Sequence, residues 1–152
     1  MKTLARQRDA TELLERLGHL RSESARRWGK MSSHQMVCHL IDGFHMMTGE
    51  KVVSHATGLA QRTILKCVVL YVPLPWPKGV LTRPEIDQEF SGRRPGDFQA
   101  DVTELEALMK MIASQAHNVD GQLHPIFGRM SEAAWLRWGY LHVDHHLRQF
   151  GV

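Results

Sequence analysis

One stretch decides the fold: residues 131–150 read SEAAWLRWGYLHVDHHLRQF. An α-helix turns roughly 100° per residue, so side chains three and four positions apart share one face. Trp135, Gly139, His142, His146 and Phe150 follow such steps, and the serine that precedes them is a typical N-cap residue. The stretch therefore predicts an amphipathic helix with two histidines on its inward face.

The spacing of His142 and His146 is typical of helical metal sites, because two imidazoles one turn apart can reach a single ion with little backbone strain. A third ligand is available in His39, in the middle of another apolar segment. The alternative is a merely polar helix face. The aromatic neighbours favour the metal, since an unpaired polar ring among them is costly. His145 falls off the line of the other two and is expected to flank the site.

Other segments also have the helical period of apolar residues. A short leading helix is expected over residues 9–20, with leucines inward, and a second helix over 32–49, with His39 and Gly43 on its inner face. A third, over 59–72, is apolar nearly all round and is expected to be buried. A fourth is expected from Asp101 to about His117.

The connections between these helices are rich in proline and glycine. Residues 79–97 have no sustained period and predict a long surface loop, a kind of segment that is often functional. Residues 121–130 are a second connection. No segment alternates as a strand does. The sequence thus predicts an all-α fold, with four long helices and a short leading one in a single domain over residues 1–152.

Composition limits the partners and the compartment. The formal net charge is +3, but the basic residues are dispersed among acidic ones, which is not the pattern of a nucleic-acid surface. The most apolar run, residues 67–75, is too short to span a bilayer. Cys38 and Cys67 lie on separate segments and no leader is visible, so we expect reduced thiols and a cytoplasmic protein that binds neither nucleic acid nor membrane.

Two groups of residues resemble one known superfamily. The residues from Trp28 to Ser32, followed by Gln35-Met36 and His39-Leu40, are similar to the second-helix signature of DinB/YfiT-like proteins. The segment HPIFG at 124–128 and the block HVDHHLRQFG at 142–151 resemble an uncharacterised branch of that superfamily. The resemblance extends from about residue 13 to residue 151.

The resemblance implies a four-helix bundle of up-down-down-up type. It also implies a divalent metal held by three histidines, which map to His39, His142 and His146. Imidazole ligands suit zinc or nickel first, with iron or manganese as further candidates. Characterised members are metal-dependent transferases or isomerases that use a low-molecular-weight thiol, so the resemblance implies a small-molecule substrate and a thiol.

Several side chains have two open interpretations. Cys38 is a possible thiolate ligand or a small buried hydrophobe. Asp42, three residues after His39, is a possible acceptor for the second ring nitrogen of that histidine or a solvated surface residue. His124 either packs its loop on the last helix or contacts substrate.

Three functions remain open at this point. The first is a metal-dependent enzyme, a thiol S-transferase or a hydrolase, because three histidines leave coordination positions free. The second is a non-catalytic protein that binds a metal or small ligand in a sensing or protective role. The third is a structural ion that ties two helices together. The apolar stretch 68–76 is also a candidate interface for a homodimer.

Overall fold

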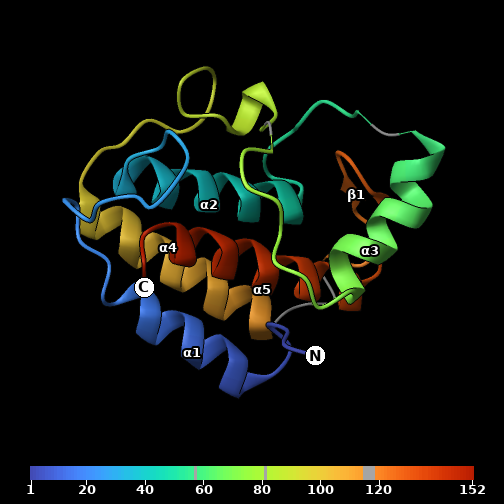
Figure 1. The fold of residues 1–152 in the computed structure, drawn as a ribbon, viewed down its shortest axis with the longest axis horizontal. Helices are drawn as coiled ribbons and strands as arrows, with labels where there is room; N and C mark the ends of the chain where they lie inside the picture. Colours follow the sequence, from blue (N-terminus) through green and yellow to red (C-terminus); the bar gives the residue numbers. More distant parts are fainter. Residues whose placement is uncertain (57, 81, 115–118) are drawn as a thin grey trace.

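The computed structural model describes residues 1–56, 58–80, 82–114 and 119–152. Within them the fold is mostly helical (Figure 1). The five α-helices are α1 (Gln7–Leu17), α2 (Ser33–Thr48), α3 (Lys66–Tyr71), α4 (Phe98–Ser114) and α5 (Glu132–Gln149). A π-helical segment, η1 (Gln61–Leu65), precedes α3, and a 3₁₀ turn, η2 (Pro84–Ile86), lies between α3 and α4. No helix among the described residues is both long and apolar enough to cross a membrane.

Four of the helices enclose the core. Figure 1 shows α1, α2, α4 and α5 lying together, and α1 and α2 each contact both α4 and α5. The fully buried side chains come from all four helices and include Leu13, Leu40, Leu105 and Trp135. Burial of such large apolar side chains is the main favourable contribution to folding. The same packing brings the inner faces of α2 and α5 into contact.

Helix α2 begins and ends as its sequence predicts. Ser32 accepts a hydrogen bond from the backbone N–H of Gln35, and the Gln35 side chain accepts one from the backbone N–H of Ser32. This capping box satisfies two N–H groups that have no partner within the helix. The helix ends at Gly49, whose φ of 83° is a left-handed conformation that glycine adopts without strain. The cap of α5 is also as predicted, because the Ser131 side chain accepts from the backbone of Ala134.

The prediction that the segment 59–72 is buried was wrong. Its helical part covers residues 59–71, and Leu70 is the one buried residue within η1 and α3. Ile64 and Val68 are exposed. A helix that is apolar on every face can be buried within its own chain or against another molecule. The sequence pattern does not tell these two cases apart. The leading helix is short, as expected, and it buries Leu13 and Leu17 completely, as its leucine pattern predicted.

Three smaller expectations also need correction. The connection 121–130 contains a two-stranded antiparallel hairpin, β1 (Leu123–His124) and β2 (Gly128–Arg129), whose two-residue strands are too short to show an alternating pattern. Helix α4 begins at Phe98 rather than at Asp101, and its expected end near His117 lies outside the described residues. The loop 79–97 is not wholly superficial, because Ile86 and Gln88 are buried.

Candidate metal centre

The three predicted histidines meet between two helices. His39 comes from the middle of α2, and His142 and His146 come from successive turns of α5. All three side chains are buried, and one ligand nitrogen of each lies within 4.8 Å of those of the other two. The Nε2 atoms of His39 and His142 are 3.0 Å apart. The core packing of α2 on α5 therefore places three imidazole donors around one point.

The orientation of His39 is fixed from the loop before α4. Its Nδ1 lies 2.8 Å from the carbonyl oxygen of Ile86, an acceptor, so Nδ1 carries the ring proton and Nε2 has a free lone pair. A histidine that donates its second nitrogen in this way is oriented as a metal ligand. Sequence reasoning proposed the Asp42 carboxylate for this role, but Nδ1 of His39 faces a backbone carbonyl. The sequence gives no sign of such a partner, because every residue has a backbone carbonyl and the loop is distant from His39 in the chain.

His146 is oriented by its own helix. Its Nδ1 donates to Oε1 of Gln149, at 2.9 Å, and the Gln149 amide nitrogen donates to the carbonyl of Trp28, at 2.8 Å. The second bond fixes which end of the amide faces the ring. Nε2 of His146 is thereby left free for a ligand. Gln149 was not singled out from the sequence, although its position three residues after His146 puts it on the same face.

His142 is held by packing. Its ring lies 4.5 Å from the Trp138 ring, centroid to centroid, and 6.2 Å from that of Trp76. A Cβ atom at Gly43 would stand 3.1 Å from Cε1 of His142, which is tighter than an ordinary contact. The absence of a side chain at Gly43, on α2, gives this imidazole its room.

Burial keeps the three rings neutral. Removal from water lowers the pKa of His39 and lowers the pKa values of His142 and His146 well below their usual range, and neighbouring histidines lower the last two further. A neutral imidazole has the lone pair that a metal requires. In a tetrahedral site with metal–nitrogen bonds of ~2.0–2.1 Å, the nitrogens stand about 3.3 Å apart. The 3.0 Å between His39 and His142 is close to that separation, so the residues fit a divalent ion.

His145 lies beside this centre, as predicted. Its ring is 5.9 Å from that of Trp28, 6.0 Å from that of Trp76 and 5.2 Å from that of His146. Lys78 lies over the Trp28 ring, 4.5 Å from its centroid. His145 is half-buried between the two indoles. These aromatic rings therefore form the margin of the histidine centre.

Asp42 is neither a surface residue nor a partner of His39. Its buried carboxylate accepts hydrogen bonds from the Lys51 ammonium at 2.6 Å, the Gln88 amide at 3.1 Å and the backbone N–H of Arg93 at 2.7 Å. Two of these donors belong to the loop that also supplies the carbonyl of Ile86. Asp42 therefore attaches that loop to α2.

His124 packs its hairpin on α5. Its Nδ1 accepts hydrogen bonds from the backbone N–H groups of Ile126 and Phe127, and its ring stacks on Phe127 and contacts Trp138. Burial lowers the pKa of His124 to about 3. These contacts support the packing interpretation of this residue.

A second group of donors lies between α2 and α4. It consists of His34, Cys38 and Asp101, and their donor atoms are within 4.8 Å of one another. Burial, with the Asp101 carboxylate beside it, raises the pKa of the Cys38 thiol to about 12. Burial alone would raise the pKa of Asp101, but hydrogen bonds from His34, the Gly96 backbone and Arg93 lower it.

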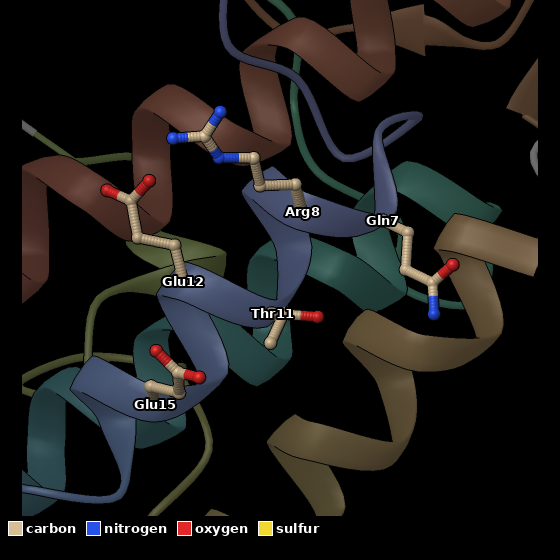
Figure 2. Close-up of a pocket in the computed structure, with 5 residues that line it drawn as sticks. All are labelled: Gln7, Arg8, Thr11, Glu12 and Glu15. Atoms are coloured by element: carbon tan, nitrogen blue, oxygen red, sulfur yellow. The ribbon is translucent and has the colours of Figure 1, made fainter.

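One surface hollow lies over α1. Its lining residues are Gln7, Arg8, Thr11, Glu12 and Glu15 (Figure 2). All five come from a single helix, and Figure 2 shows Arg8 and Glu12 on one side of it and Gln7 on the other. No histidine lines this hollow. It supplies no convergent buried polar groups of the kind that fix a ligand.

Comparison with known proteins gives one match. No curated protein and no solved structure matches the chain. One family model matches residues 4–151, which cover both helices of the histidine centre. The chain therefore belongs to the family described as "Protein of unknown function (DUF1569)".

Proposed function

We propose that His39, His142 and His146 bind one divalent cation. The observation that carries this proposal is the convergence of three buried, neutral imidazoles whose ligand atoms lie within 4.8 Å of one another. Two of the rings have their second nitrogen occupied by an oxygen acceptor, which leaves Nε2 for the ion. Zinc or nickel suits three imidazoles first, and iron or manganese follow.

The chain is, in this proposal, a member of the DinB-like superfamily with a four-helix bundle. The contacts of α1 and α2 with both α4 and α5 support a bundle, and the position of the histidines on α2 and α5 supports the relationship. The leading helix then serves as one of the four, in place of the segment 61–71.

The proposed activity is that of a metal-dependent enzyme, a thiol-dependent S-transferase acting on small electrophiles. Among the described residues, the donor group at this centre has three members, which leaves coordination positions for exogenous ligands. A bound divalent cation would lower the pKa of a coordinated thiol or water. The protein's own part is to keep the three imidazoles neutral, oriented and shielded from water by Trp76 and Trp138.

Metal analysis tests the binding step. The His142→Ala/His146→Ala double variant should contain about one equivalent of divalent metal less than the wild type, because two of the three ligands of this centre are removed. His45→Ala is the matched control, since His45 lies on α2 outside the centre. Equal metal in the wild type and the double variant would sink the proposal, provided that both remain folded by circular dichroism.

Thiol consumption tests the catalytic step. We expect the metal-loaded protein to consume a low-molecular-weight thiol in the presence of a small electrophile, to stop on chelation and to recover when metal is returned. A panel of thiols, electrophiles and metals covers the substrate class. If metal binds but no thiol is consumed above the metal-free control, the non-catalytic binding function replaces this one.

A further inference from the structure

The cluster of His34, Cys38 and Asp101 has three different metal-ligating groups and no part in the function proposed above. His34 and Cys38 are one turn apart on α2, and Asp101 stands in the first turn of α4. His34 Nε2 is 2.6 Å from Oδ2 of Asp101, and Cys38 Sγ is 3.6 Å from the same oxygen. One carboxylate oxygen thus faces both an imidazole and a thiol.

The charges around the cluster favour a cation. Asp101 and Glu104 are acidic, and both are bound by one guanidinium, that of Arg93. With His34 neutral, the formal charge of these groups is therefore −1 with a neutral thiol and −2 with a thiolate. Arg93 engages Oδ1 of Asp101, at 2.6 Å, whereas Oδ2 faces His34 and Cys38 and also accepts from the backbone N–H of Gly96, at 3.3 Å. A divalent ion bound to a thiolate, a carboxylate and an imidazole balances the remaining charge.

The distances suit a tetrahedral ion of the size of Zn²⁺. With a metal–sulfur bond of ~2.3 Å and a metal–oxygen bond of ~2.0 Å, the sulfur and oxygen stand about 3.5 Å apart. The observed separation between Cys38 Sγ and Asp101 Oδ2 is 3.6 Å. To accept an ion between them, His34 Nε2 and Asp101 Oδ2 must move apart from their separation of 2.6 Å. That movement is open to His34, whose side chain is 17% exposed.

We propose that His34, Cys38 and Asp101 form a second metal site, for a borderline divalent cation such as Zn²⁺ or Co²⁺, with its fourth position open to solvent on the side of His34. Thiolate and imidazole together select such ions over Mg²⁺ and Ca²⁺. The site joins α2 to the start of α4. It shares no ligand with the three-histidine centre, so it stands whether or not the proposed function holds.

Cobalt spectroscopy tests the site directly, because a cobalt–thiolate bond gives a near-ultraviolet charge-transfer band that an all-histidine centre does not give. Titration of metal-free protein with Co²⁺ should produce this band. Cys38→Ser should abolish it, and Cys67→Ser, a change of the exposed cysteine on α3, should keep it. The His142→Ala/His146→Ala variant should also keep it.

If folded wild-type protein gives no such band on titration with Co²⁺, the proposal is wrong. The three residues then form only a hydrogen-bonded cluster. A band that disappears in Cys67→Ser but persists in Cys38→Ser also overturns the proposal. Should Cys38→Ser fail to fold, His34→Gln replaces it, because His34 is partly exposed. That variant should bind Co²⁺ at this site at least 10-fold more weakly, and unchanged affinity in it contradicts the assignment.

Discussion

At the scale of single residues, His124 shows how burial and hydrogen bonding set a side chain's role. Its Nδ1 accepts from two backbone N–H groups, which is possible only while that nitrogen carries no proton. The pKa of about 3 follows from its burial. The folded protein therefore binds no proton here across the range in which the unfolded chain, with a pKa near 6.5, does.

This difference predicts a pH-dependent stability. Because the unfolded state binds more protons between pH 3 and 6.5, the contribution of His124 to stability is complete above the unfolded pKa and is lost as pH falls. Between pH 7 and pH 5 the loss is about 2 kcal/mol. In His124→Asn an amide oxygen replaces Nδ1 as acceptor, and that group does not titrate.

We expect His124→Asn to be less stable than the wild type at pH 7, because the stacking of the imidazole ring is lost. On acidification, however, the variant should lose less stability than the wild type. Urea unfolding at pH 7 and pH 5 measures both effects in metal-free protein. His19→Asn is the control for a surface histidine, since His19 is exposed. If the variant loses as much stability between pH 7 and pH 5 as the wild type does, the neutral state assigned to His124 is wrong.

At the scale of elements, Asp42 joins α2 to the loop that orients His39. Its carboxylate accepts from Lys51, Gln88 and the backbone of Arg93, while Ile86 of the same loop accepts from His39. The loop therefore belongs to the histidine centre through its backbone. The Asp42 carboxylate is thus one of the contacts that hold this long loop, which has no helical period, against α2.

Asp42→Asn should loosen this loop, because one acceptor oxygen becomes a donor and the charge that pairs with Lys51 is lost. We expect a loss of about 1–3 kcal/mol in the free energy of unfolding and faster proteolysis within residues 84–97. Urea unfolding and limited proteolysis measure these two effects. Glu89→Gln, an exposed change in the same loop, should alter neither. Unchanged proteolysis of Asp42→Asn would show that the loop is held by other contacts.

At the scale of the whole molecule, the apolar surface of η1 and α3 has no partner within the described chain. Ile64, Val68 and Tyr71 are exposed on these segments. Figure 1 shows α3 at one end of the molecule, beside the hairpin. Exposed apolar surfaces of this kind are typical of association sites, and this surface overlaps the stretch 68–76 that the sequence offered as a candidate homodimer interface.

We predict that the protein self-associates through this surface and that Ile64→Glu/Val68→Glu shifts it to monomer. Light scattering over a concentration series measures the change. The free energy of unfolding of the monomer should change little, since both residues are exposed. Phe90→Glu, a change of an exposed apolar residue in the loop before α4, is the control and should leave association intact. A monomeric wild type at high concentration would contradict the prediction.

The sequence by itself determined the helices that carry the site. Caps at Ser32 and Ser131 and the turn spacing of His142 and His146 depend on residues close together in the chain, so their local chemistry is visible there. It also selected His39, because helical phase assigns a residue to the inner face. These inferences needed no knowledge of what the helices pack against.

Only the tertiary structure decided which groups surround the three histidines and which form the second cluster. The carbonyl of Ile86, the role of Asp42 and the pairing of Cys38 with Asp101 join positions separated by 47, 51 and 63 residues. Such contacts depend on how helices and loops pack, which local periodicity does not encode. The exposure of the segment 61–71 was decided in the same way, because an apolar helix buries itself only where the rest of the chain supplies a surface to cover it.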